Sequence, residues 1–266
     1  MNKDMRERYK ENDFDVAQIP DEWKKAELKL QLEWSLCYQQ RKDIETCKII
    51  SDPEEENHII LIRPEVFNNL DLYRIDVFHE LCHAKLSEVV SPAFSTLYFK
   101  KEYGKLDGEA KKEFQRMAQM LYLAWAHVDI WVNDLRHENW PELTRQDIES
   151  FRKNVEKLSV GNFPEILGNL QTIIGIAINK AETNRHFSHS KKKPKPLNMN
   201  FLDRKTMDLI NKLAKYYETL PKLKMEESED IAMLENSVQK VVNIFGFSIK
   251  PTLTREDKRS VWSFEK

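Results

Sequence analysis

A chain of 266 residues can bury a sizeable core, and with only 6 glycines and 32% charged residues its composition favours long helices over turn-rich β-structure. The charges nearly cancel to a formal net charge of −2, so composition gives no electrostatic argument for a dedicated nucleic-acid-binding protein. No apolar run reaches the roughly 18 residues of a membrane span, and Met1–Asn12 is too charged for a secretory signal. We therefore expect a cytoplasmic protein whose three cysteines are free or buried thiols.

The first predicted elements are one helix and two strands. Pro20, Asp21 and Glu22 offer a helix start, and apolar residues interspersed with charged ones then predict a helix over 21–41. Two short β-branched runs, Cys47–Ser51 and His58–Arg63, are separated by a polar turn and predict a hairpin or two neighbouring strands. The second run could be an ordinary core strand or an edge strand to which an extended peptide adds.

The sequence of the remainder of the chain predicts helices joined by polar segments. They are expected at about Leu70–Glu88 after an Asn68-Asn69 cap, Glu109–His137, Thr144–Leu158, Phe163–Ala181, Leu202–Leu220 and Glu229–Phe245. A Lys/Pro-rich linker near 186–198 predicts a solvated connector, with a phosphate-binding patch as its alternative. The last twenty residues are polar and predict a tail.

A metal-binding motif lies within the helix predicted over Leu70–Glu88. The string His79-Glu80-Leu81-Cys82-His83 fits H-E-x-x-H. Histidines four positions apart project from one helix face, so both imidazoles can reach one zinc ion. Glu80 would sit beside the open coordination position, where it can take a proton from an attacking water molecule. The competing interpretation is a pair of ordinary surface or core histidines.

A catalytic zinc site needs a third protein ligand, and the strongly apolar stretch from Met117 to Leu135 contains three candidates. A carboxylate embedded in so apolar a helix must be paired or coordinated, because burying it alone is very costly. On an uninterrupted helix Asp129 lies on one face, whereas His127 and Asp134 lie on another. The residues alone leave the choice among these three open.

A family resemblance favours Asp129. H-E-x-x-H followed by a later helix reading Ala-His-Val-Asp-Ile-Trp-Val-Asn-Asp, residues 126–134, resembles bacterial and phage metallopeptidase domains in which Asp is followed four residues later by Asn. This resemblance implies Asp129 as the third ligand and Asn133 as a partner that orients Asp129 or a ligating histidine. The layout over roughly 49–134 is similar to a minimal zincin. His-Glu-Leu-Cys-His-Ala is more distantly similar to SprT-type proteases, although no downstream His-Gly segment supplies that family's third histidine.

These features predict a mainly α protein with a small β-sheet. We expect a zincin-like metallopeptidase core with an N-terminal helix over 1–158, and a helical extension over 159–266. The leading hypothesis is a zinc-dependent peptidase with a protein or peptide substrate and no membrane or nucleic-acid partner, in which Zn²⁺ is held by His79, His83 and Asp129 and Glu80 is the general base. Two histidines and one carboxylate also suit iron.

Two alternatives remain open at this point. The chain could be a zincin-like regulatory or partner-binding protein with narrow or no proteolytic activity, or a helical scaffold with a fortuitous motif. The histidines without a partner at ligand spacing are expected at the surface; they are His58, His137, His186 and His189. The tyrosines that could donate to an oxyanion are Tyr73, Tyr98, Tyr103 and Tyr122.

Overall fold

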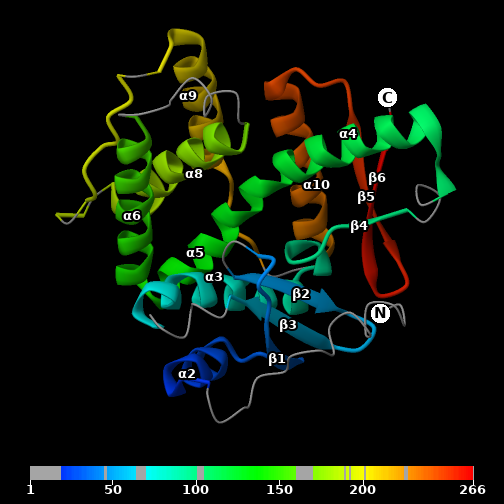
Figure 1. The fold of residues 1–266 in the computed structure, drawn as a ribbon, viewed down its shortest axis with the longest axis horizontal. Coiled ribbons are helices and arrows are strands. Elements are labelled where there is room, and N and C mark those ends of the chain that lie inside the picture. The colour runs from blue at the N-terminus through cyan, green and yellow to red at the C-terminus, as the bar shows by residue number, and fades with distance from the viewer. Residues whose placement is uncertain are drawn as a thin grey trace. The chain divides into compact units, whose positions relative to one another are not determined.

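The fold is mainly helical with two small three-stranded sheets, so the predicted α+β class is confirmed (Figure 1). The computed structural model describes residues 19–44, 47–63, 70–100, 105–159, 170–188, 190–191, 193–200, 202–224 and 227–265. Contacts group the chain into two units, one of residues 1–100, 224–231 and 253–263, the other of residues 101–223, 232–252 and 264–266. The division into 1–158 and 159–266 concerns domains rather than contact clusters and stays a prediction.

The N-terminal part of the first unit differs from the single helix predicted over 21–41. Helix α2, Asp21–Leu30, ends where Gln31 adopts a left-handed backbone conformation with φ of 53°. Residues Ser35–Gln40 then form strand β1, which pairs in parallel with a distant strand from Ser35↔Asn57 to Gln40↔Ile62. The prediction was wrong here because this pairing partner lies about twenty residues away and leaves no local signal.

The first sheet has the strand order β1-β3-β2, with β2 at Lys48–Asp52 and β3 at Asn57–Ile62. Strand β2 runs antiparallel to β3, so the predicted pair of neighbouring strands is confirmed. Residues 58–62 of β3 are all buried, which explains why Ile59 to Ile62 form a continuous rather than an alternating apolar run. Because β3 is the central strand, the hypothesis that it offers a free edge to a peptide is wrong.

Helix α3, Leu70–Val89, carries the motif and confirms the predicted helix to within one residue at its C-terminal end. It packs on α2, β2 and β3 and buries Val77, Phe78, Leu81 and Leu86. The expected Asn68-Asn69 cap lies outside the described residues. A short 3₁₀ turn, Pro92–Phe94, follows α3, and the backbone N–H of Ala93 in this turn donates to the Ser91 hydroxyl at 3.2 Å.

The second sheet has the order β4-β6-β5, with β4 at Tyr98–Phe99, β5 at Lys250–Glu256 and β6 at Arg259–Glu265. The prediction of a polar C-terminal tail is therefore wrong. Strands β5 and β6 are joined by a turn in which Asp257 takes a positive φ of 56°, and β4 pairs in parallel with β6. Burial of Leu253, Val261 and Trp262 anchors this hairpin.

The second unit consists mainly of helices (Figure 1). Its elements are α4 at Gly108–Trp125, a 3₁₀ turn at Ala126–Val128, α5 at Asp129–Asn139, α6 at Pro141–Ser159, α8 at Leu170–Phe187, α9 at Arg204–Thr219 and, from residue 232 on, α10 at Glu227–Phe245. The helix predicted over Glu109–His137 is thus interrupted, and Asp129 begins a new one. Within the described ranges, no helix combines the length and the apolar character that crossing a membrane requires.

Candidate metal centre

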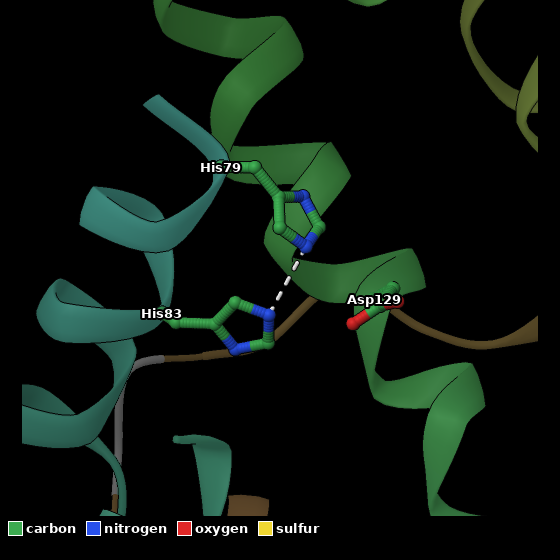
Figure 2. A group of neighbouring side chains, drawn as sticks. All are labelled: His79, His83 and Asp129. Atoms are coloured by element: carbon green, nitrogen blue, oxygen red, sulfur yellow. Dashed lines mark hydrogen bonds between the residues drawn. The ribbon is translucent and has the colours of Figure 1, made fainter. Parts of the chain in front are cut away.

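The two histidines of the motif converge on one point. His79 and His83 lie one turn apart on α3, and their Nε2 atoms are 3.1 Å from each other (Figure 2). A tetrahedral zinc ion with bonds of about 2.0–2.1 Å holds two ligand nitrogens about 3.3 Å apart. The spacing of the two Nε2 atoms therefore fits two neighbouring ligand positions around one ion, as the i, i+4 pattern predicts.

A backbone carbonyl fixes the chemical state of His83. Its Nδ1 lies within hydrogen-bonding distance of the carbonyl oxygen of Phe94, and since a carbonyl can only accept, Nδ1 carries the proton. In the neutral ring the lone pair is then on Nε2, the atom that faces His79. Metal-ligating histidines commonly donate their second ring N–H to a carbonyl in this way. The 3₁₀ turn at Pro92–Phe94 thus prepares His83 as a ligand.

Asp129 completes a group that could hold a metal ion. The ligand atoms of His79, His83 and Asp129 all lie within 4.8 Å of one another, and no other such group of His, Cys, Asp or Glu occurs among the described residues (Figure 2). The structure therefore contains the predicted His/His/Asp cluster. Two imidazoles and one carboxylate leave a fourth tetrahedral position open, as catalytic zinc sites do, and the same donors also suit iron.

The other two candidates for the third ligand have structural roles in the second unit. His127 is fully buried, donates from Nδ1 to the carbonyl of Ala124 and has its Nε2 atom 2.7 Å from the Ser237 hydroxyl. Asp134 forms an ion pair with Arg185, and its Oδ1 lies 3.3 Å from Nε2 of His186. Both side chains are thus satisfied by neighbours in their own unit, and the expectation that a buried carboxylate is paired holds for Asp134.

Glu80, the predicted general base, is oriented by the first sheet. Its Oε2 accepts the backbone N–H of Ile49 in β2 at 3.0 Å. Ile49 lies opposite Ile60 in the β2–β3 ladder, and with β2 at the edge of the sheet this N–H points toward α3 rather than toward β3. The strand therefore fixes the carboxylate next to His79 on the helix.

The outer edge of β2 also has hydrogen-bond partners at Ser51, two residues after Ile49. The N–H of Ser51 donates to the Thr96 hydroxyl at 3.1 Å, and the carbonyl of Ser51 accepts the Tyr98 hydroxyl at 3.0 Å. Of the four tyrosines proposed as oxyanion donors, Tyr98 thus binds backbone and Tyr122 is 52% exposed. Tyr103 lies outside the described residues, as does the side chain of Tyr73.

The prediction that His58 lies at the surface is wrong. His58 is fully buried, its Nε2–H donates to Glu88 at 3.1 Å, and its Nδ1 lies 2.7 Å from the Ser51 hydroxyl. Glu88 also accepts the backbone N–H groups of Glu33 and Trp34, at 2.9 and 2.8 Å. Ser51, His58 and Glu88 have the composition of a nucleophilic triad, but the complete burial of Ser51 and His58 excludes a substrate from them. Their hydrogen bonds instead connect the first sheet to α3.

A second polar network joins α5 to α8, and the sequence did not indicate it. Asn133 donates to Glu182, whose pKa is raised by burial to about 8, so this carboxyl group is largely protonated at neutral pH. The expected role of Asn133 toward Asp129 stays a prediction.

His186 is also mostly buried, with 7% of its side chain exposed, so its predicted surface position is wrong as well. Its ring stacks on that of His137, with 4.3 Å between the ring centroids. His189 lies outside the described residues.

The cysteines agree with the sequence-based expectation of free thiols. Cys37 is exposed, whereas Cys47 and Cys82 are buried, and none of the three forms a disulfide bond. Burial, together with the nearby charges of Asp76 and Glu80, raises the pKa of the Cys47 thiol well above its usual range. Cys47 is therefore protonated at neutral pH.

Comparisons with known proteins identify no relative of this chain. The chain matches no protein-family model, no curated protein and no solved structure.

Proposed function

We propose that this protein is a zinc-dependent peptidase that hydrolyses a peptide bond with water. The observation that carries the proposal is the 3.1 Å separation of the His79 and His83 Nε2 atoms on α3, beside a glutamate whose carboxylate the edge strand holds in place. Asp129 is the proposed third ligand because its carboxylate belongs to the same group of ligand atoms.

The proposed reaction divides its tasks among a few side chains. His79, His83 and Asp129 hold the ion, and the Phe94 carbonyl keeps His83 in the ligating tautomer. The chemistry supplied by bound zinc is Lewis acidity, which lowers the pKa of water and polarises the substrate carbonyl. Glu80 accepts the proton of the attacking water and passes it to the leaving nitrogen as the C–N bond breaks. Water oxygen thus ends in the new carboxylate, and one water molecule is consumed per bond cleaved.

A narrow substrate range is the second candidate, and one observation favours it. Extended substrates commonly add to a free strand edge, but at Ser51 the N–H and C=O of the edge strand β2 already bind Thr96 and Tyr98. A general peptide therefore has fewer main-chain partners along β2 than an open edge offers. This favours a protein that cleaves one partner over one that degrades unfolded chains.

The test is hydrolysis in water enriched in oxygen-18. We would load the protein with zinc, add a mixture of unstructured peptides and identify products by mass spectrometry. The peptidase proposal predicts products with one heavy oxygen in the new C-terminal carboxylate, for wild type and for the control Glu138→Gln, which alters an exposed carboxylate of α5. Glu80→Gln should give no product while retaining zinc.

Three other outcomes are informative. Cleavage of a single cellular protein but not of the peptides, again lost in Glu80→Gln, would support the narrow-range candidate. Equal activity of Glu80→Gln and wild type would contradict Glu80 as the base. Absence of any Glu80-dependent cleavage in both the peptides and a whole-cell protein extract would contradict the peptidase proposal.

A further inference from the structure

A cavity of about 170 Å³ lies within the second unit, between helices α6 and α8 and the segment that follows α8. This segment is drawn in yellow and leads to α9 (Figure 1). The residues that line the cavity are Arg152, Ile176, Asn179, Lys180, Thr183, Asn184, Lys193, Pro194, Pro196, Leu197 and Met199. Three of them are cationic, and none of these described lining residues is Asp or Glu.

Arg152 is the most buried of the three cations, with 6% of its surface exposed. Its Nε donates to Asn179 at 2.9 Å, one terminal nitrogen donates to Thr183 at 2.5 Å, and the other donates to the carbonyl of Lys195. All three acceptors are neutral. A guanidinium group has five N–H donors, so these bonds leave two N–H groups for a further acceptor.

The two lysines of the cavity also bind neutral groups. Lys180 donates to the side-chain oxygen of Asn211 at 2.6 Å, and Lys193 donates to that of Asn184 at 3.3 Å. Two other arginines of the same unit have carboxylate partners: the buried Arg136 pairs with Asp147, and the partly buried Arg185 pairs with Asp134. Arg152 forms no such ion pair with any described residue. Burial of its charge lowers the pKa of Arg152, and the charges of Glu149 and Glu156 on the same helix only partly oppose this effect. The cavity thus holds positive charge that an anion would neutralise.

Five of the other lining residues are apolar. They are Ile176 of α8 and the residues Pro194, Pro196, Leu197 and Met199. A cavity lined by three cations and by several aliphatic groups suits a ligand that has an anionic head and an apolar body. Three positive charges match a dianion better than a single carboxylate, and guanidinium groups bind phosphate oxygens particularly well.

We propose that this cavity binds the phosphate monoester of a small organic molecule. The phosphate contacts Arg152, Lys180 and Lys193, and the organic part packs against the proline-containing segment 194–199. Under this proposal the Lys/Pro-rich segment is part of a phosphate-binding site, which the sequence analysis gave as the alternative to a solvated connector. This site is independent of the metal centre and of the proposed peptidase activity.

The test uses phenyl phosphate, which combines a dianionic head with an apolar ring, in calorimetric titrations of the full chain. We expect one site per chain and weaker binding, by about tenfold, in Lys180→Gln and in Lys193→Gln, because each loses one charge-assisted contact. Lys191→Gln is the matched control: Lys191 is exposed and close in sequence but does not line the cavity, so its affinity should equal that of wild type.

The comparison ligands separate the two halves of the proposal. Inorganic phosphate should bind more weakly than phenyl phosphate, and benzyl alcohol should not bind measurably. Circular dichroism establishes that the variants are folded; Lys193 is exposed, so its replacement leaves the fold intact. The proposal is overturned if phenyl phosphate shows no saturable binding at millimolar concentration. It is equally overturned if all three lysine variants bind like wild type, or if inorganic phosphate binds as tightly as the ester.

Discussion

The carboxylate of Glu80 accepts the backbone N–H of Ile49 at 3.0 Å, so the group proposed as the catalytic base also secures the edge strand of the first sheet to helix α3. This bond gives Glu80 two separable roles. The proton transfer requires a carboxylate, whereas the contact with Ile49 requires only an acceptor oxygen.

Two substitutions at Glu80 should separate these roles. Glu80→Gln keeps an acceptor for the Ile49 N–H, so its free energy of unfolding should stay close to that of wild type while hydrolysis is lost. Glu80→Ala leaves that N–H without its acceptor and should in addition lower the free energy of unfolding by about 1–3 kcal/mol. Urea denaturation of the zinc-free proteins measures the difference. Equal stability of the two variants would show that the Ile49 bond does not stabilise the fold.

The network around Glu88 predicts a pH-dependent contribution to stability. Burial raises the pKa of Glu88, but the hydrogen bonds from His58 and from the backbone of Trp34 and Glu33 outweigh this effect, so the pKa lies below its ordinary value of 4.5. A carboxylate with a lowered pKa stabilises the folded state at pH values above 4.5, and this stabilisation is lost as the pH falls through the folded-state pKa.

Glu88→Gln should therefore destabilise the protein at neutral pH, by about 1–3 kcal/mol for the loss of charge-assisted bonds. The difference from wild type should shrink once the pH is low enough to protonate Glu88. Urea denaturation across this pH range checks both statements. Glu54→Gln, at an exposed glutamate of the same unit, provides the control. A difference between Glu88→Gln and wild type that stays constant with pH would contradict the proposed role of the charge.

Histidine burial predicts acid sensitivity of the second unit. Burial lowers the pKa of His127 from 6.5 to about 4, although the bond to Ala124 acts in the opposite direction. A histidine with a lowered pKa stabilises the fold above its ordinary pKa, and the stabilisation is lost as the pH falls toward the folded-state value. Between neutral pH and about pH 5 this loss amounts to about 2 kcal/mol.

His127→Gln removes the titrating group from this position. The variant should be less stable than wild type at neutral pH because it loses the contacts with Ser237 and Tyr217. On acidification to about pH 5, however, it should lose about 2 kcal/mol less stability than wild type does. Urea denaturation at the two pH values measures this. If both proteins lose the same amount, His127 is not responsible for the acid sensitivity.

How far the sequence predicts this protein depends on the range of the signals involved. His79 and His83 were predicted because their meeting requires only helical geometry over four residues, and α3 follows from its own apolar pattern. Strand β1 was missed because its partner β3 is distant in sequence. The C-terminal hairpin was missed because its sequence is polar overall, although the burial of its strand β5 alternates around Leu253 and its turn lies at Asp257.

The sequence also failed to predict which polar side chains are buried and paired with one another. The sequence predicts His58 at the surface because no partner lies at ligand spacing from it, yet Glu88, thirty residues later, binds its imidazole. Likewise, sequence could not separate Asp129 from Asp134, whereas the structure pairs Asp134 with Arg185 on another helix. Such pairings depend on how helices pack, and a single sequence contains no pattern that reports them.

The most direct test of the metal centre is zinc content by elemental analysis after reconstitution, compared between wild type, Asp129→Asn and Glu138→Gln. The control alters a carboxylate on the same helix whose only ion pair among the described residues is an exposed one with Lys222. We predict one zinc ion per chain in wild type and in Glu138→Gln, and at least about a 100-fold loss of zinc affinity in Asp129→Asn, because removing even an outer partner of a ligand costs about 10–100-fold. Full zinc retention with unchanged affinity in Asp129→Asn would contradict the His79–His83–Asp129 site.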